Sequence, residues 1–191
     1  MTTFESIAAL DAEHGMQTYG RLPVAFVRGE GVKLWVSEGN EYLDFLGGLA
    51  VTALGHAHPA VADALAEQVR TLLHVSNLYF NEWQPQVAAR LDALHGGGGK
   101  VFFSNSGAEA NECAIKLARR YGQANGGRER FHVLSAWGSF HGRTLTTLAA
   151  TGQPQKQETF QPLPSGFRQV GFGDLDALAA AMDERVCAVR A

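Results

Sequence analysis

The feature that most constrains this chain is the junction within VFFSNSGAEANECAIKLARRYG, residues 101–122. Bulky apolar residues at its start are typical of a buried strand, and a helical spacing of apolar residues begins soon afterwards. Only the small residues 104–107 lie between the two patterns, which leaves no room for a loop. The stretch therefore predicts a strand over 101–105 that passes directly into a helix over 107–121, ended by Gly122.

The start of this predicted helix has the residues of a phosphate-binding site. With Ser106 as the N-cap, Glu109 falls at the third helical position, and the two form a reciprocal Ser-x-x-Glu capping box. The amides of Gly107 and Ala108 then stay free at the positive end of the helix dipole, and neither side chain would exclude an anion. The alternative is a tight turn whose small residues serve packing alone. The stretch has neither Gly-x-Gly-x-x-Gly nor Gly-x-x-x-x-Gly-Lys, so it indicates neither a dinucleotide site nor a P-loop.

The chain divides into two regions around residue 75. Region 1–75 begins with a docking arm over 1–20, and short turns then predict an antiparallel meander and a first helix, which together form part of a small domain and its linker. Region 76–191 alternates strands and helices as parallel sheets do, and it is expected to be the first part of a large cofactor-binding domain. The meander strands are 24–27, 32–36 and 42–45. The other expected elements are helices 59–74, 81–95, 144–150 and 175–184 and strands 132–136 and 186–189.

A second stretch, HVLSAWGSFHGRTLTTLAATG over residues 132–152, places an aromatic ring and a guanidinium group beyond the end of a strand. Phe140 is suited to stack on a flat cofactor ring, and Arg143 is suited to hold a carboxylate through two parallel hydrogen bonds. Each has an alternative, with Phe140 as a core residue and Arg143 as one half of a surface ion pair. His141 is expected to be a loop histidine bonded to the backbone.

The composition excludes several classes of protein. The 191 residues, 46% hydrophobic and 18% charged, are typical of a globular chain, and the net charge of -3 gives no basic surface for nucleic acid or an anionic membrane. We therefore expect no nucleic-acid or membrane partner. Cys113 and Cys187 indicate neither a disulfide framework nor a zinc site, so a cytoplasmic location is expected. His56 and His58 are two histidines without a further ligand nearby, and we assign no metal.

Five stretches of the sequence resemble the N-terminal half of the class III (ornithine-type) aminotransferases, and they appear in the same order as in that family. They are TYGRLPVAFVRGEG, YLDFLGGLAVTALGHAHPAV, HVSNLYFN, FFSNSGAEANECAIKLARRYG and SFHGRTLTTLAATGQPQKQETFQPLPSGF. The resemblance implies an α/β structure of fold type I, pyridoxal 5'-phosphate as cofactor, a homodimer, and amino-acid and 2-oxo-acid substrates. It places the cofactor phosphate on Gly107 and Ala108, Phe140 against the pyridine ring and Arg143 on the substrate carboxylate.

Within this family, the chain resembles the acetylornithine branch. That branch moves an amino group from N-acetylornithine to 2-oxoglutarate in arginine biosynthesis, and the stretch HVSNLYFN favours it. Ornithine, succinylornithine and 4-aminobutyrate remain alternative donors, because Arg143 suits any donor that has a carboxylate.

The resemblance also implies catalytic groups that this sequence does not supply. The family needs a lysine that binds the cofactor covalently and a carboxylate on the pyridine nitrogen. None of the lysines here matches the family's lysine motif; they are Lys33, Lys100, Lys116 and Lys156. We therefore assign no catalytic residue and expect the lysine beyond Ala191, which makes this chain the N-terminal portion of an enzyme and inactive alone. A shortened, non-catalytic binding module of the same fold is the alternative.

Overall fold

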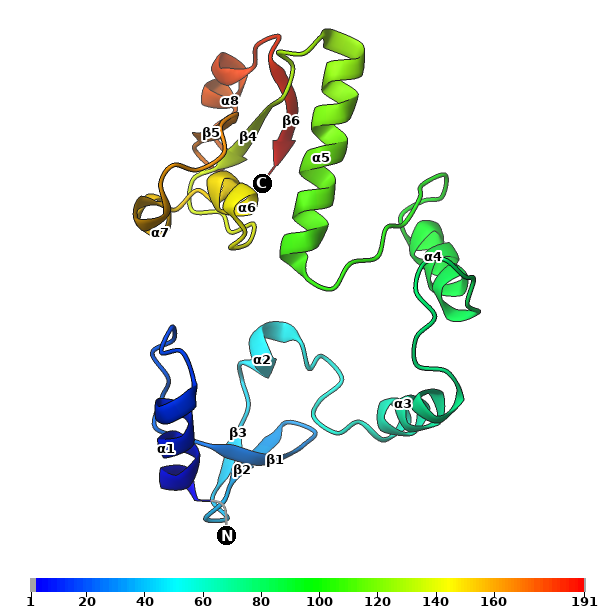
Figure 1. Ribbon diagram of the computed structural model, residues 1–191, viewed down its shortest axis with the longest axis vertical. Helices are drawn as coiled ribbons and strands as arrows, with labels where there is room; N and C mark the ends of the chain where they lie inside the picture. The colour runs from blue at the N-terminus through cyan, green and yellow to red at the C-terminus, as the bar shows by residue number, and fades with distance from the viewer. Residues whose placement is uncertain (1–2, 191) are drawn as a thin grey trace. The chain divides into compact units, whose positions relative to one another are not determined.

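The computed structural model describes residues 3–190, and their contacts form two compact units (Figure 1). The first unit extends to Glu82, and the second begins at Trp83. Each unit is described by itself. The functional division that the sequence places at residue 75 stays a prediction.

The first unit contains the predicted meander. Its strands are β1 (Phe26–Glu30), β2 (Lys33–Val36) and β3 (Glu41–Leu43), which pair antiparallel in the order β1-β2-β3. Before them, helix α1 (Phe4–His14) lies within the segment expected to be a docking arm. Thr3 and Ser6 form a capping box at its start, which satisfies backbone groups of the first turn.

A left-handed turn, α2 (Gly47–Ala50), follows the meander, and helix α3 (Pro59–Thr71) follows the turn. Leu49 and Ala50 both have φ above +60°, a conformation that costs a residue with a side chain about 1–2 kcal/mol. Asp44 supports the turn, because its Oδ1 accepts the Gly47 amide at 2.8 Å and its Oδ2 lies 2.7 Å from His56 Nε2. The hydrogen bond from His56, followed by that from Gly47, lowers the pKa of the Asp44 carboxyl. The His56 ring is thus engaged by Asp44.

The second unit begins with helix α4 (Trp83–Leu94) and contains the long helix α5 (Gly107–Gly126). Two predictions about this region are wrong. Residues 101–105 form no strand, since a strand requires a paired neighbour and the described part of the chain gives them none. Gly122 does not end α5 but is buried within it, where an added methyl group would lie 2.5 Å from Cys187 Cβ. The helix instead ends at Gly127, which has a φ of +84°.

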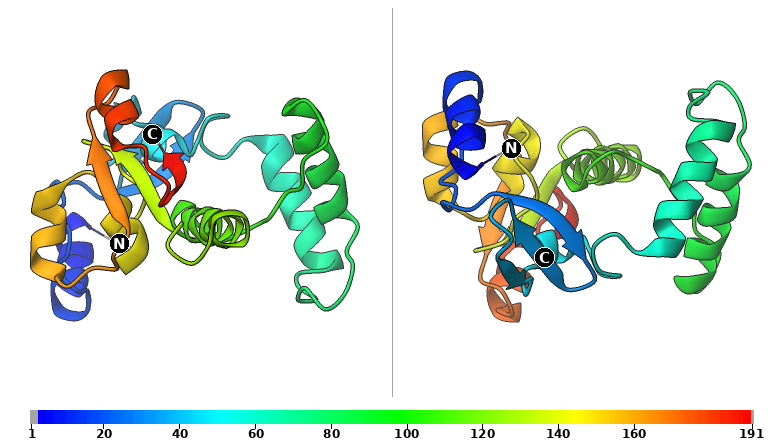
Figure 2. Two further views of the ribbon diagram at one scale, coloured as in Figure 1. Left: turned by 90° about the horizontal axis from the view of Figure 1, so that it is seen from above. Right: turned by 90° about the horizontal axis from the view of Figure 1, so that it is seen from below.

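A parallel sheet forms the centre of the second unit. Its strands are β4 (His132–Ala136), β5 (Phe167–Val170) and β6 (Val186–Arg190), in the order β5-β4-β6 (Figure 2). Strand β5 was not expected from the sequence. Short helices join the strands, and they are α6 (Leu145–Ala150), α7 (Pro154–Gln157), the 3-10 helix η1 (Glu158–Phe160) and α8 (Leu175–Ala181).

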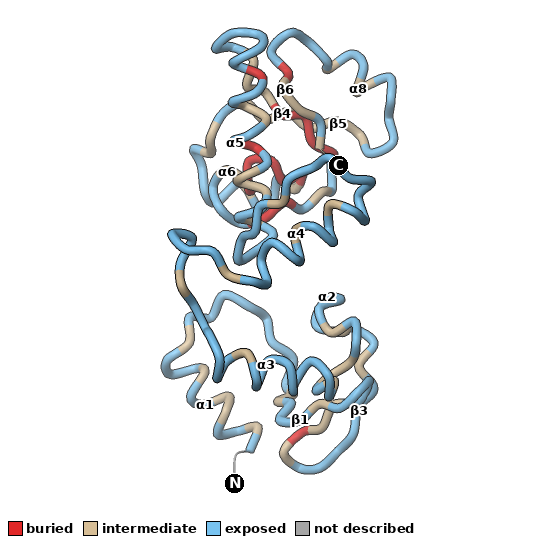
Figure 3. Tube along the Cα trace, turned by 90° about the vertical axis from the view of Figure 1, so that its right-hand side faces the viewer, coloured by how far each residue is buried: buried red, intermediate tan, exposed pale blue. Residues whose placement is uncertain are grey.

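The core lies between this sheet and two of the helices. Ile115 of α5, Val133 of β4 and Ala150 of α6 pack into one buried cluster, which Phe167 and Cys187 extend from the neighbouring strands. Figure 3 shows that the buried part of this unit is concentrated on β4, α5 and α6. Helices α5 and α6 are therefore fixed against the central strand, which matters because both adjoin the candidate site.

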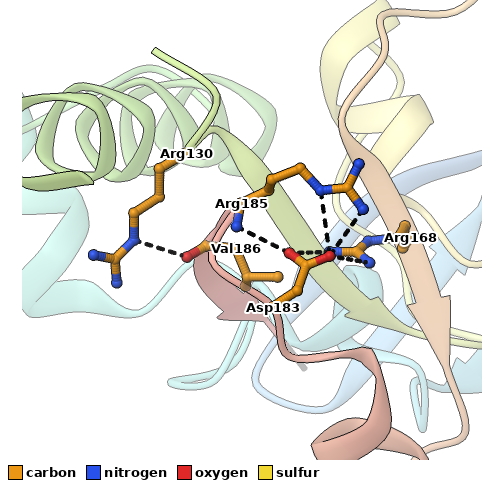
Figure 4. A network of polar contacts seen from close by, with 5 residues as sticks. All are labelled: Arg130, Arg168, Asp183, Arg185 and Val186. Atoms are coloured by element: carbon orange, nitrogen blue, oxygen red, sulfur yellow. Dashed lines mark hydrogen bonds and ion pairs between the residues drawn. The ribbon is translucent and has the colours of Figure 1, made fainter. Parts of the chain in front are cut away.

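An ion-pair network lies near the amino ends of the strands (Figure 4). The Arg168 guanidinium donates to both oxygens of Asp183 at 3.1 Å, and Arg185 donates to the same carboxylate from its amide and its side chain. Alongside, Arg130 Nε donates to the Val186 carbonyl at 3.1 Å. The hydrogen bonds from Arg185 and then Arg168 hold the pKa of Asp183 far below its usual range. Through these hydrogen bonds, Asp183 holds the segment before β6 against strand β5.

We predict that Asp183→Asn lowers the thermal unfolding midpoint at pH 7. The folded-state pKa of Asp183 is depressed, so its contribution is present above the ordinary Asp pKa of about 3.9 and is lost as the pH falls below it. The difference from wild type should therefore shrink below about pH 4, and added salt should reduce it, because the pair is partly exposed. Asp63→Asn, an exposed change on α3, is the control. Identical midpoints for wild type and Asp183→Asn at pH 7 would contradict the role of the network.

Candidate active site

The candidate site lies within the second unit, beyond the carboxyl end of β4. It combines the amino end of α5 with the loop over residues 137–144, which we call the β4–α6 loop. In open α/β sheets, ligands bind where the strands end in this way. The structure thus brings together the two regions that the sequence singles out as candidate binding segments.

The amino end of α5 is capped, although not entirely as predicted. Ser106 Oγ accepts the Glu109 amide at 3.2 Å, as expected of an N-cap. The Glu109 carboxylate does not return to Ser106, however, but accepts the amide of Asn105 at 2.6 Å. The Glu109 carboxylate thus binds the amide one residue before the N-cap, so the capping box is not reciprocal. Both hydrogen bonds still fix the first turn of the helix.

The first two residues of α5 remain suited to an anion. The opening amides of a helix have no acceptor within the helix itself, and those of Gly107 and Ala108 lie at the positive end of α5. Apart from its chain neighbours and its own helix backbone, a methyl group added at Gly107 would meet no described protein atom within 4 Å, so no other part of the fold crowds this residue. Open space and free donors are what a phosphate group requires, and the observation therefore fits a bound phosphate.

The β4–α6 loop packs directly on α5. Gly142 has a φ of +130°, and a methyl group there would lie 2.8 Å from Ala108 Cβ and 2.6 Å from Thr147 Oγ1. One turn further along the helix, Asn111 Nδ2 donates to the His141 carbonyl, and Thr144 Oγ1 donates to Glu112 Oε1 at 2.5 Å. Glu112 and Lys116 are four residues apart, which is the spacing of a surface ion pair on a helix, but the partner that the fold gives Glu112 is Thr144. The loop is consequently held on α5 at His141, Gly142 and Thr144.

His141 anchors this loop from within the fold. Its side chain and backbone are 4% exposed, its amide donates to Thr151 Oγ1 at 3.0 Å, and Arg190 Nε donates to its ring Nδ1 at 2.9 Å. The ring was expected to bond to the backbone, whereas its recorded partner is the Arg190 side chain. Burial, followed by the Arg190 charge, lowers the pKa of His141, and an accepting Nδ1 belongs to a neutral ring with its proton on Nε2.

Phe140 and Arg143 lie on either side of this anchor. Phe140 is 56% exposed, so its ring is available to a ligand rather than packed in the core. Lys156 Nζ lies 5.5 Å from the centroid of the Phe140 ring, a contact that the sequence did not suggest. Arg143 is also exposed, and Gln153 Nε2 fastens the loop before Phe140 by donating to the Ser139 carbonyl at 3.0 Å.

Several residues that shape the site were missed from the sequence. Asn111 and Glu112 lie three and four positions after Ala108 and so share its face of the helix. This spacing is the sequence feature that could have identified them as neighbours of the site. Their loop partners are about thirty positions away in the chain, so no local pattern pairs them. The described residues contain no group of three or more potential metal ligands, and no helix among them is long and apolar enough to cross a membrane.

A parallel sheet with an open helix amino end and an exposed aromatic–arginine loop beyond a strand end is typical of an α/β domain that binds a phosphorylated ligand. The chain matches the Aminotransferase class-III family over residues 15–190 and belongs to it. The predicted family, fold class and cofactor are confirmed by this match and by the related structures.

Similar proteins include acetylornithine aminotransferases from distant organisms. That of Caldanaerobacter subterraneus subsp. tengcongensis is 52% identical over 174 residues, which cover 91% of this chain and 44% of the relative. That of Methanocaldococcus jannaschii is 47% identical over 94% of this chain and 45% of the relative. The chain thus spans less than half the length of the curated relatives that it matches.

Solved structures show the same fold. The ornithine aminotransferase of Toxoplasma gondii ME49 superposes with a TM-score of 0.92 at 30% identity, covering 99% of this chain and 45% of that one. The taurine:2-oxoglutarate aminotransferase of Bifidobacterium kashiwanohense, solved with pyridoxal phosphate and glutamate, gives 0.85 at 25% identity, covering 99% and 48%. The truncated α/β fold of this chain therefore corresponds to somewhat less than half of each.

We predict that Gly107→Val weakens binding of pyridoxal phosphate to the complete protein. The fold has space for the added methyl groups, and we expect them to crowd a phosphate group held at the start of the helix. A lost hydrogen bond to a charged group costs about 1.5–3 kcal/mol, or roughly 10- to 100-fold in the dissociation constant. Equilibrium dialysis measures the effect, with Gly107→Ala as the smaller step and thermal unfolding as the check on folding. Unchanged cofactor affinity in a folded Gly107→Val protein would remove this helix end from the site.

Proposed function

We propose that the complete protein is an aminotransferase that moves an amino group from N-acetylornithine to 2-oxoglutarate. The observation that carries the proposal is the packing of the β4–α6 loop on α5, which puts an exposed aromatic ring and an arginine beside an open helix amino end. The names of the similar proteins favour N-acetylornithine as the donor.

In this proposal, each candidate residue performs one binding task. The amides of Gly107 and Ala108 hold the cofactor phosphate, and Phe140 lies against the cofactor ring. Arg143 grips the carboxylate of the amino donor and then of the 2-oxo acid. The bound cofactor supplies an electron-withdrawing ring and a carbonyl group that exchanges amino groups. The chain's own contribution is to orient both molecules before this chemistry occurs.

His141 supports the task without touching the substrate. The Asn111 amide, the Thr151 hydroxyl and the Arg190 guanidinium hold it at its carbonyl, its amide and its ring, so the residues on either side of it have little freedom. Burial lowers the pKa of His141, which favours the neutral ring that accepts the hydrogen bond from Arg190.

The covalent lysine belongs, in our proposal, to the part of the relatives that this chain does not cover. Lys33 is paired with Glu41 in the meander, at 2.9 Å. Lys156 is the lysine seen beside Phe140, and its ammonium group lies over the ring of that residue. Lys100 and Lys116 are exposed. With the covalent lysine placed outside this chain, we expect the chain alone to be inactive.

We further propose a homodimer in the cytoplasm. Large apolar side chains of the first unit are well exposed, among them Leu46, Leu49 and Val51. Exposed apolar groups of this kind are typical of surfaces that another chain or segment covers. Cys113 and Cys187 are both free thiols, which agrees with a reducing compartment.

The complete protein should transaminate N-acetylornithine with 2-oxoglutarate and show the highest kcat/KM for that donor. The measurement is glutamate release with each of four donors in turn, which are N-acetylornithine, ornithine, succinylornithine and 4-aminobutyrate. A higher kcat/KM for another donor would replace the substrate assignment. A folded, cofactor-binding protein that transaminates none of them would support the non-catalytic binding module instead.

The chain of residues 1–191 alone should form no stoichiometric covalent adduct with pyridoxal phosphate. The test is incubation with the cofactor, reduction with borohydride and measurement of the intact mass. Lys156→Met is the informative control, because Lys156 lies beside Phe140. A stoichiometric adduct that is absent in Lys156→Met, together with transamination by the unmodified chain, would show that this protein uses Lys156 and that we have placed the lysine wrongly.

A further inference from the structure

Both chain neighbours of Arg143 are fixed on helix α5. On one side, Gly142 lies so close to Ala108 that an added methyl group would be 2.8 Å from Ala108 Cβ. On the other side, Thr144 Oγ1 donates to Glu112 Oε1 at 2.5 Å. The backbone of Arg143 is therefore held at both ends.

The two contacts are made by the same face of the helix. Ala108 and Glu112 are four residues apart, which places them one above the other and about 6 Å apart along the axis. Ala108 also carries one of the amides proposed to hold the cofactor phosphate. The first two turns of α5 thus set the position of the Arg143 backbone relative to the phosphate site.

The assignment of hydrogen-bond donors and acceptors shows that the Thr144–Glu112 bond is separate from the cap of α6. Thr144 Oγ1 accepts the Thr147 amide at 3.3 Å and so caps α6. A carboxylate only accepts hydrogen bonds, so the Thr144 hydroxyl proton points to Glu112. The Thr147 hydroxyl, 2.7 Å from Thr144 Oγ1, then serves as a donor, and Thr147 is fully buried. Removal of the Glu112 carboxylate therefore breaks the link to α5 and leaves the cap in place.

We propose that Glu112 is a positioning residue that acts through Thr144 to set where the Arg143 guanidinium meets the substrate carboxylate. The proposal rests on the function proposed above, because it takes Arg143 as the carboxylate-binding group. A purely structural role would affect folding and cofactor binding, whereas a positioning role affects carboxylate binding selectively.

The test uses the complete protein with bound pyridoxal phosphate and measures binding of glutarate, a dicarboxylate without an amino or keto group, by calorimetry. Glu112→Ala should weaken glutarate binding about tenfold and raise KM for both substrates, while the cofactor dissociation constant and kcat change little. Glu112→Gln keeps an acceptor oxygen and should restore most of the affinity. Lys116→Ala, an exposed change on the same helix, is the matched control, and Arg143→Lys is the reference for a lost carboxylate contact.

A double-mutant cycle tests the route of the effect. If Glu112 acts through Thr144, then Glu112→Ala combined with Thr144→Val should bind glutarate no more weakly than Thr144→Val alone. Additive losses would overturn the proposal, as would a Glu112→Ala protein that binds glutarate like Lys116→Ala, or one that loses cofactor and glutarate affinity by the same factor.

The experiments distinguish a failure of the positioning role of Glu112 from a failure of the proposed aminotransferase function. A protein that binds glutarate in an Arg143- and Glu112-dependent manner but transaminates no donor supports the positioning role and overturns the aminotransferase assignment. A protein that transaminates normally while Glu112→Ala binds glutarate like wild type overturns the positioning role alone.

Discussion

Gly142 lies so close to the first turn of α5 that any side chain at this position would collide with Ala108 and with Thr147. Its φ of +130° is also a conformation that residues with a side chain rarely adopt. Glycine is therefore required twice at this one position, by the backbone angle and by the space. The contact fixes the β4–α6 loop on the helix that opens the phosphate site, and the geometry of Phe140 and Arg143 depends on it.

The elements that the sequence predicts correctly are those set by local pattern. The meander follows from closely spaced turns, and α5 follows from the Ser106 cap and the helical spacing that it starts. The failures concern non-local pairing. Strand β5 is short and mixed in composition, and it forms because Phe167–Val170 pairs with β4, a partner more than thirty residues earlier. Residues 101–104 have a stronger strand pattern but no paired neighbour in the described chain.

The same distinction applies to the candidate site. Gly107, Ala108, Phe140 and Arg143 were predicted from chemistry that is visible in short stretches, and their roles remain proposals. The contacts that hold them together were not predictable in this way. Glu112 shows why, since helical spacing favours a surface pair with Lys116 that is worth only about 0.3–0.5 kcal/mol. The Thr144 hydroxyl, which the fold brings to 2.5 Å, is a partner that no local rule identifies.

In the parallel sheet, the ion-pair network and the candidate binding residues lie at opposite ends of the strands. Asp183 and Arg185 precede β6, and Arg168 lies near the start of β5, so their network stands at the amino ends of the strands. The β4–α6 loop follows the carboxyl end of β4. Because the network and the buried cluster around Val133 stabilise the unit and His141 anchors the loop, Phe140 need not contribute to the core. This explains how Phe140 can be exposed in a well-packed unit, where its ring is available to a cofactor.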